Sequence, residues 1–249
     1  MITFGLIGHR LGYSFSKKYF TDKFEKLNKT DHEYLNFELD SIDQFPEIFE
    51  RHKYIMGLNC TIPYKQEIMQ FMHEIDDEAA AVGAVNTVKI LNSDGKHFFK
   101  GFNTDVIGFR NSLKTMLKPN HTKALILGTG GASKAIKHVL KGLGIEYISA
   151  SIEEKLAADE LRYEDLTASV IAERQLIINA TPLGTFPNVN DCPNMPYCSV
   201  TDKHILFDLV YNPELTKFLK KGKERGAQIK NGLEMLHGQA EAAWEIWNR

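Results

Sequence analysis

The sequence predicts an α/β fold in which short apolar strands alternate with amphipathic helices. Runs of apolar residues such as 2–8 and 124–127 are each followed by apolar side chains at helical spacing. A glycine-rich turn at 128–133 joins one of these strands directly to a helix. The chain has 249 residues, 43% of them hydrophobic, which suffices for one large domain or two of modest size. Alternation of this kind predicts a parallel sheet with right-handed crossovers.

The part of the chain before Asn103 is predicted to be mixed and mainly βαβ. Ser41 and Gln44 have the spacing of a capping box, and Pro63 suits the first position of a helix. The Asn-Ser-Asp-Gly sequence at 92–95 favours a hairpin turn. Strands are expected at 2–8, 35–39, 54–58, 85–91 and 96–100, and helices around 19–27, after 41–44 and after Pro63.

The part of the chain from Asn103 onward alternates more regularly, as a parallel sheet requires. A helix is expected to begin near 103–105, and the glycine turn leads into a second helix with apolar residues at 136–143. The remaining expected elements are strands at 124–127, 146–150, 176–179 and 205–210, a helix at 215–223, a short strand at Ile229 and a final amphipathic helix through 236–247.

The composition narrows the classes of function. Lys and Arg number 30 against 32 Asp and Glu, a net charge of -2, which disfavours a general nucleic-acid or membrane-surface binder. No apolar run reaches the roughly 18 residues of a membrane span, and the N-terminus lacks the basic flank of a signal peptide. Cys60, Cys192 and Cys198 do not have zinc-site spacing and the histidines are scattered, so no metal is expected. We expect a soluble cytoplasmic protein with reduced thiols.

The glycine turn carries the clearest binding signal, because a strand runs directly into it and a helix runs directly out. Gly128 permits the tight turn, and Gly130 leaves room for a pyrophosphate against the backbone. The amides at the start of the helix then face the anion. Ser133 stands at the third glycine position and is small enough for close helix packing. The alternative interpretation is a strand–turn–helix unit that binds nothing.

The residues alone leave open which dinucleotide binds there. An acid near the end of the second strand favours NAD, whereas a nearby arginine favours the 2′-phosphate of NADP. That strand ends in Ser-Ala-Ser at 149–151, with neither residue type at its tip. Lys155 offers a positive charge for a phosphate, and Glu153 and Glu154 oppose it.

Several short motifs follow one another along the chain. They are Ser14-Phe15-Ser16, Asn59-x-Thr61-x-Pro63-x-Lys65, Gly83-Ala84-Val85-Asn86-Thr87, Asn103-Thr104-Asp105, the glycine turn, Ile178-Asn179-Ala180-Thr181-Pro182, Asp208-Leu209-Val210-Tyr211 and Asn231-Gly232-Leu233-Glu234-Met235-Leu236, with Gln239 shortly after. From residue 2 to the last helix, this ordered set resembles the shikimate dehydrogenase family. The second, third and fourth motifs are each fairly specific, and their joint order is strongly so.

The resemblance implies two α/β domains with a cleft between them. An N-terminal, mixed and mainly parallel substrate domain would comprise 1–104 and 233–249, and a Rossmann-type NADP(H)-binding domain would comprise 105–232. The implied activity is that of an oxidoreductase, the reversible NADPH-dependent reduction of 3-dehydroshikimate to shikimate on the route to chorismate and the aromatic amino acids. The implied partners are these small molecules, without nucleic acid or membrane, and the expected state is a monomer or homodimer.

The resemblance also implies roles for individual residues. Lys65 and Asp105 match the catalytic pair. Ser14 and Ser16, helped by Tyr211, match the groups that bind the substrate carboxylate. The other substrate-binding positions are Asn59, Thr61, Asn86 and Gln239. The cofactor-binding positions are Gly128, Gly130, Gly131 and Ala132 at the pyrophosphate, Ser151 and Lys155 at the adenosine ribose, and Thr181, Leu209, Gly232 and Met235 on the nicotinamide side.

At the adenosine-ribose end this chain departs from the family pattern. The family typically has Asn-Arg-Thr followed by a second basic residue, whereas this chain has Ala150, Ser151 and Ile152, with only Lys155 at the second basic position. The main clamp for the 2′-phosphate is therefore absent. NADP(H) is the expected cofactor, and NAD(H) use or weak discrimination stays open.

The chemistry of ketone reduction explains why a lysine and a carboxylate are needed. Hydride transfer builds negative charge on the ketone oxygen, which a proton donor or a fixed positive charge must meet. Lys65 supplies both, because a lysine is an ammonium at neutral pH, and a neighbouring Asp105 would favour that form. Oxidation needs a base, so we expect it to accelerate as the pH rises. Which of the two residues carries the proton stays open.

Structural interpretations stand beside these roles. Ser16 and Asp105 could be helix caps, Asn86 a turn residue at a strand edge, Gln239 helix surface, and Tyr211 a packing residue. Rival functions also remain. The carboxylate-binding serines would equally suit a quinate-type dehydrogenase with NAD or relaxed cofactor choice. The missing arginine would suit a non-catalytic nucleotide-binding relative. A Rossmann methyltransferase is disfavoured because nothing beyond the glycine turn fits.

Overall fold

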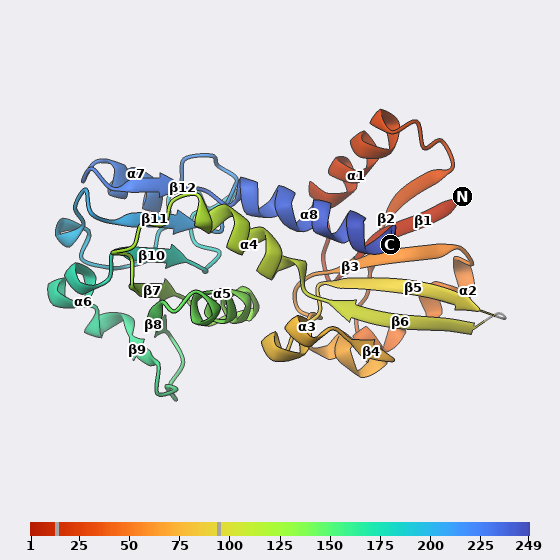
Figure 1. The fold of residues 1–249 in the computed structure, drawn as a ribbon, viewed down its shortest axis with the longest axis horizontal. Coiled ribbons are helices and arrows are strands. Elements are labelled where there is room, and N and C mark those ends of the chain that lie inside the picture. The colour runs from red at the N-terminus through yellow and green to blue at the C-terminus, as the bar shows by residue number, and fades with distance from the viewer. Residues whose placement is uncertain (13–14, 94–95) are drawn as a thin grey trace. The chain divides into compact units, whose positions relative to one another are not determined.

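A computed structural model of the chain describes residues 1–12, 15–93 and 96–249. It divides into two compact α/β units, the first comprising Met1–Thr104 with Ala240–Arg249 and the second Asp105–Gln239 (Figure 1). The last helix, α8 (Leu233–Trp247), therefore contributes to both units. The domain bounds predicted from the sequence, which place the whole of 233–249 in the first domain, stay a prediction.

The first unit is built on a mixed six-stranded sheet with the strand order β2-β1-β3-β5-β6-β4. Strand β1 pairs in parallel with β2 and β3, whereas β5 is antiparallel to β3 and β6. The ends of β1, β3 and β6 and the start of β5 therefore lie along one edge of the sheet. The strands are β1 (Ile2–Gly8), β2 (His32–Glu38), β3 (Ile55–Cys60), β4 (Glu74–Ile75), β5 (Thr87–Ser93) and β6 (Lys96–Phe102).

Short helices connect these strands. They are α1 (Phe15–Lys26), η1 (Ile42–Gln44), α2 (Glu47–Arg51), η2 (Glu67–Phe71) and α3 (Asp77–Val82), where η denotes a 3-10 helix. The predicted capping box of Ser41 and Gln44 is present at η1. The helix expected after Pro63 is instead a turn followed by η2. The carbonyl oxygen of Lys65 accepts the amide of Val85 at 2.7 Å, and this bond to a distant residue replaces one to the next helical turn.

The C-terminal part of α8 completes the core of the first unit. Its Trp247 ring lies 5.0 Å, centroid to centroid, from Phe4 of β1, and its indole N–H donates to the carbonyl of Val88 at 3.0 Å. A Cβ atom on Gly57 of β3 would lie 2.3 Å from that indole nitrogen. Only a glycine at position 57 therefore lets the Trp247 indole pack this closely against β3.

The second unit is a six-stranded sheet with the order β12-β11-β10-β7-β8-β9, and all of its strand pairs are parallel. The chain runs outward from β7 in one direction and from β10 in the other. This is a doubly wound sheet, whose switch point lies between β7 and β10. The strands are β7 (Lys123–Leu127), β8 (Glu146–Ser151), β9 (Glu160–Arg162), β10 (Leu176–Asn179), β11 (Ile205–Asp208) and β12 (Gln228–Lys230).

Helix α4 (Thr104–Lys114), which the two units share, leads into β7. The parallel strands of the second unit are connected by α5 (Gly131–Gly142), α6 (Ala168–Glu173) and α7 (Lys217–Lys223), with η3 (Tyr163–Asp165) and η4 (Tyr197–Ser199), as the sequence predicts for a Rossmann-type fold. In the described part of the chain, no helix has both the length and the apolar character that crossing a bilayer requires.

Candidate active site

Backbone hydrogen bonds bring three predicted site residues to one edge of the first sheet. The amide of Thr61 donates to Ile7 at 2.9 Å, at the end of β1. The carbonyl of Asn86 accepts the amide of Cys60 at 2.8 Å, at the end of β3. Lys65 lies at the same edge of the sheet, because its carbonyl accepts the amide of Val85, the residue before Asn86. The side chains of Thr61 and Lys65 are half-buried there.

The side chain of Asn86 fixes the start of helix α4. Its oxygen accepts the backbone amide of Thr104 at 2.7 Å and the Thr104 hydroxyl at 3.1 Å. Asn86 and Thr104 are both buried. Asp105 follows directly and is the second residue of α4, so it lies within the helix and is not its N-cap. The two hydrogen bonds from Thr104 to Asn86 therefore fix the direction of the backbone just before Asp105.

Asn59 is buried and its amide is satisfied within the protein. The oxygen accepts the hydroxyl of Tyr34 at 2.8 Å. The nitrogen donates to the hydroxyl of Thr87 at 3.2 Å and to the carbonyl of Asn86 at 3.4 Å. Among the predicted substrate-binding residues, Asn59 therefore lies behind the edge formed by Thr61 and Asn86.

Of the two serines predicted to bind a carboxylate, Ser14 lies outside the described residues. Ser16 is half-buried and is the second residue of α1, so capping this helix is not its role. Its hydroxyl is hydrogen-bonded to that of Tyr34. Burial raises the pKa of Tyr34 strongly, and the hydrogen bond from Ser16 opposes the rise. The Tyr34 phenol is thus neutral and acts as a hydrogen-bonding group.

The glycine turn of the second unit has the form of an anion site. Gly128 has φ +100°, and a Cβ on it would lie 2.8 Å from the Thr181 methyl carbon, so glycine is required there. Gly130 is the N-cap residue of α5, and among the described residues no side chain caps the helix. A Cβ built on Gly130 or Gly131 would meet no described atom within 4 Å outside its chain neighbours and the backbone of its own helix. The amide of Ser133 donates to the Gly130 carbonyl at 2.9 Å, and the space beside Gly130 and Gly131 leaves room for a pyrophosphate at the start of α5.

A buried carboxylate supports the loop after β10. The Asn179 side-chain oxygen accepts the amide and hydroxyl of Thr181 at 3.0 and 2.7 Å, and its nitrogen donates to Asp208 at 2.9 Å. Asp208 also accepts from the Thr216 hydroxyl at 2.5 Å and the Val210 amide at 3.0 Å. Burial raises the pKa of Asp208 to about 6, although these hydrogen bonds oppose the rise. The sequence places Asp208 at the start of the Asp208–Tyr211 motif, directly after three apolar residues, but indicates no role for it.

The remaining predicted nicotinamide-side residues come together in the second unit. Gly232 donates its amide to Val210 at 3.1 Å, and a Cβ on it would lie 2.1 Å from the carbonyl oxygen of Leu209. Met235 is buried, and its carbonyl approaches Gly108 of α4. Two further predicted residues, Tyr211 and Gln239, are half-buried.

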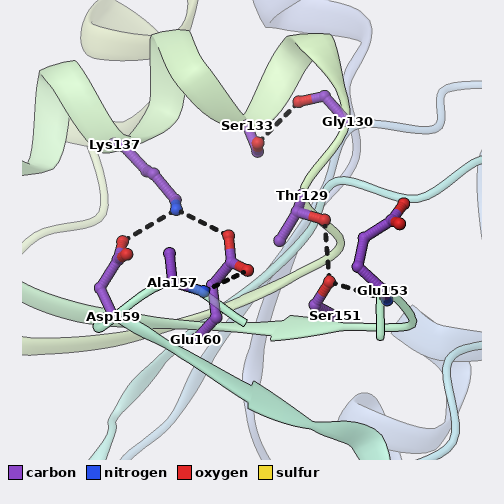
Figure 2. Close-up of polar contacts among 9 residues, drawn as sticks. All are labelled: Thr129, Gly130, Ser133, Lys137, Ser151, Glu153, Ala157, Asp159 and Glu160. Atoms are coloured by element: carbon purple, nitrogen blue, oxygen red, sulfur yellow. Dashed lines mark hydrogen bonds and ion pairs between the residues drawn. The ribbon is translucent and has the colours of Figure 1, made fainter. Parts of the chain in front are cut away.

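Figure 2 shows the end of β8, where the adenosine ribose is expected. Ser151 is buried, and its hydroxyl bonds to that of Thr129 at 3.2 Å and accepts the Glu153 amide at 3.2 Å. Lys137 is held in ion pairs with Asp159 at 2.8 Å and Glu160 at 3.5 Å (Figure 2).

The tip of β8 therefore presents hydroxyl and carboxylate groups. Ile152 is 86% exposed at the turn, and Lys155 is also exposed. Arg162, on β9 beside Ser151, donates to the carbonyl of Glu154 at 3.1 Å. The site fits a dinucleotide. The usual arginine for the 2′-phosphate is absent, and the cations nearest to its position are Lys155 along the sequence and Arg162 on the paired strand β9.

One doubly wound unit with a glycine turn suited to an anion, together with one α/β unit with a polar sheet edge, defines a dinucleotide-binding protein of two domains. Comparison with known proteins gives the particular family. Residues 6–88 match the model of the shikimate dehydrogenase substrate binding domain. The shikimate dehydrogenase (NADP(+)) of Clostridium beijerinckii is 38% identical, over 98% of this chain and 91% of that protein. This chain belongs to the shikimate dehydrogenase family.

Two solved structures of shikimate 5-dehydrogenases are similar to this chain in fold. The Thermus thermophilus shikimate 5-dehydrogenase in complex with NADP(H) and shikimate has a TM-score of 0.84 at 29% identity, covering 99% of this chain and 93% of that chain. The Listeria monocytogenes shikimate 5-dehydrogenase in complex with shikimate and NAD has a TM-score of 0.86 at 28% identity, covering 99% and 91%.

Proposed function

We propose that this chain catalyses the reversible reduction of 3-dehydroshikimate to shikimate with a nicotinamide dinucleotide. The observation that carries the proposal is the gathering of Thr61, Lys65 and Asn86 on one sheet edge, where Asn86 also fixes the residue before Asp105. A polar edge with a half-buried ammonium suits a substrate that carries hydroxyls and a ketone. Membership of the family supports the same reaction.

Lys65 and Asp105 are the proposed catalytic pair. In the direction of reduction, the Lys65 ammonium meets the negative charge that develops on the ketone oxygen and delivers a proton to it. Half-burial strengthens this interaction, because the local dielectric is lower than that of water. In the direction of oxidation, the neutral amine of Lys65 accepts the proton of the reacting hydroxyl, and Asp105 is proposed to hold a ring hydroxyl beside it. When bound, the reduced nicotinamide supplies the hydride.

The remaining substrate contacts follow the family pattern. Ser14 and Ser16, with Tyr211, are proposed to hold the carboxylate. Thr61, Asn86 and Gln239 are proposed to hold the ring hydroxyls. A substrate that lacks the ring hydroxyls would leave these protein groups without hydrogen-bond partners. The site is therefore specific for a substrate that carries them.

The cofactor is proposed to lie along the glycine turn, with Gly130, Gly131 and Ala132 at the pyrophosphate. NADP(H) is the proposed cofactor because the Clostridium beijerinckii relative is named an NADP(+) enzyme. The end of β8, with Ser151 hydrogen-bonded inside the turn and Ile152 exposed, supports appreciable use of NAD(H) as well. Lys155 is the residue we assign to the 2′-phosphate.

An oxidation assay tests this function. The protein is mixed with shikimate and NADP⁺, and separately with NAD⁺, and the absorbance of the reduced nicotinamide is followed. Lys65→Ala should lower kcat by at least about 100-fold, with a smaller change in substrate binding, because it removes the proton donor. Lys53→Ala, an exposed lysine of the same unit, is the matched control and should leave kcat unchanged.

Two outcomes would contradict the proposal. Oxidation of quinate without oxidation of shikimate would show a quinate-type dehydrogenase. Binding of a dinucleotide without turnover of either acid would show a non-catalytic relative. We further propose that the protein is cytoplasmic and works as a monomer or homodimer, with Cys192 and Cys198 as thiols.

A further inference from the structure

A continuous row of hydrogen-bonded side chains runs through the interior of the first unit. It joins helix α1 to the start of helix α4 across β2, β3 and β5. Its members are Ser16, Tyr34, Asn59, Thr87, Asn86 and Thr104. All except Ser16 are less than 6% exposed. We call this set the interior polar row.

The first half of the row runs from Ser16 to Asn59. The Tyr34 hydroxyl has a single hydrogen, which it donates to the Asn59 oxygen at 2.8 Å. Its oxygen accepts from Ser16. The Tyr34 ring is held in place by stacking on Phe20 of α1, with centroids 4.8 Å apart and an interplanar angle of 9°. The hydroxyl therefore has a fixed position from which to orient Ser16.

The second half of the row runs from Asn59 to Thr104. The Asn59 nitrogen donates to the Thr87 hydroxyl at 3.2 Å, and that hydroxyl donates to the Asn86 oxygen at 3.0 Å. Thr87 also lies 3.0 Å, oxygen to oxygen, from the Thr104 hydroxyl. The same Asn86 oxygen accepts the Thr104 amide. Thr87 thus braces the side chain that sets the start of α4.

The two ends of the row coincide with two separate parts of the proposed site. One end is a serine proposed to bind the substrate carboxylate. The other end is the Asn86–Thr104 pair, which directly precedes the proposed catalytic Asp105. Buried polar side chains in the middle have no other evident use, and a buried network of this kind costs desolvation free energy that apolar residues would avoid.

We infer that Tyr34 and Thr87 are positioning residues of the dehydrogenase, which hold the carboxylate-binding end and the catalytic end of the site in one fixed register. The inference rests on the proposed function. Tyr34 acts through Ser16 and so governs substrate binding. Thr87 acts through Asn86 and Thr104 and so governs the alignment of Asp105. Asn59 links the two.

The test compares Tyr34→Phe and Thr87→Val with Thr3→Val in shikimate oxidation. Thr3 is the matched control because it is a buried threonine of the same sheet, on β1, whose hydroxyl donates to Glu33 outside the row. Tyr34→Phe should raise the KM for shikimate by about tenfold with kcat nearly unchanged, and Thr87→Val should lower kcat by about tenfold with KM nearly unchanged. Thr3→Val should change neither KM nor kcat beyond about twofold, whatever its effect on stability.

A double-mutant cycle tests whether Tyr34 acts through Ser16. Adding Tyr34→Phe to a Ser16→Ala variant should raise the KM no further, because the hydroxyl that Tyr34 orients is already absent. Additive effects would overturn this route. If folded Tyr34→Phe and Thr87→Val proteins have wild-type KM and kcat, or change only as Thr3→Val does, the inference is wrong and the proposed function stands. A wild-type protein inactive on shikimate overturns both.

Discussion

The backbone amide of Thr104 donates a 2.7 Å hydrogen bond to the side-chain oxygen of Asn86, and the chain passes from the first unit to the second at the next residue. A side chain of one strand edge thus determines the course of the backbone into Asp105. The catalytic carboxylate proposed here depends on an amide group that lies 19 positions earlier in the sequence.

We expect Asn86→Ala to lower kcat/KM for shikimate by about 100-fold, because it removes a ring-hydroxyl contact and leaves the Thr104 amide and hydroxyl without their acceptor. Steady-state kinetics measures the effect. Asn92→Ala, at an exposed asparagine on β5, the strand that follows Asn86, is the control and should behave as the wild type. Equal kinetics for the two variants would contradict the role of Asn86.

Asp208 should make the stability of the protein depend on pH. Its carboxyl binds a proton more strongly in the folded state, where burial raises the pKa to about 6, than in the unfolded chain, where the pKa is 3.8. The folded state therefore gains stability from the protonated form, and this gain is lost as the pH rises from about 4 to about 6. The loss is about 3 kcal/mol for a shift of roughly two pKa units.

Denaturant unfolding of the wild type and Asp208→Asn at several pH values measures this effect. The asparagine cannot titrate and retains an oxygen for the Asn179 and Val210 donors. The difference in free energy of unfolding between the two proteins should shift by about 3 kcal/mol in favour of the variant between about pH 4 and about pH 7. A difference that stays constant across this range would show that Asp208 does not titrate there.

Cofactor choice should respond to a single added charge at the end of β8. Ile152 is exposed beside the hydrogen-bonded Ser151–Thr129 pair (Figure 2), so Ile152→Arg adds a cation without disturbing that pair. We expect the Kd for NADPH to fall by about tenfold and the Kd for NADH to change little, since a charge-assisted bond to the 2′-phosphate is gained. Fluorescence titration measures both constants.

Two further variants test whether the effect of Ile152→Arg comes from its charge and from the 2′-phosphate. Ile152→Gln, which is polar and uncharged, should leave the preference as it is. Lys155→Ala should weaken NADPH binding selectively, if Lys155 meets the phosphate. A parallel change in the affinities for NADPH and NADH in Ile152→Arg would place this turn away from the 2′-phosphate.

Gly57 should be indispensable for the packing of Trp247. In Gly57→Ala the added methyl group would collide with the indole, so the ring must move and lose its hydrogen bond to Val88. We expect the free energy of unfolding to fall by about 2–4 kcal/mol. Gly142→Ala, where the added carbon meets no described atom within 4 Å, should be close to neutral. Thermal or denaturant unfolding distinguishes the two, and similar values for both would refute the packing argument.

The local sequence predicts the elements whose signals are themselves local. The glycine turn can be predicted because Gly128, the strand before it and the helix after it are contiguous in the sequence. The capping box of Ser41 and Gln44 can be predicted for the same reason. Helix α3 was missed although Asp76 caps its start and Gly83, with φ +69°, ends it, because a helix so short has little apolar periodicity.

The interior polar row and the carboxylate beneath Thr181 could not be predicted in this way. Their partners come from different strands, so they depend on strand register, which no short motif encodes. Asn59 illustrates this: its motif suggests a substrate ligand, whereas its three hydrogen-bond partners are Tyr34, Thr87 and Asn86. Tyr34 gives no sign of its role, because a tyrosine is common in half-buried strands.

The packing of Trp247 against Phe4 has a consequence for how the protein is made. Strand β1 leaves the ribosome early, but its aromatic neighbours on α8 follow only after the entire second unit has been translated. The nascent first unit therefore keeps part of its apolar surface uncovered until α8 has been translated. Chaperone demand should accordingly fall on the N-terminal sheet during synthesis.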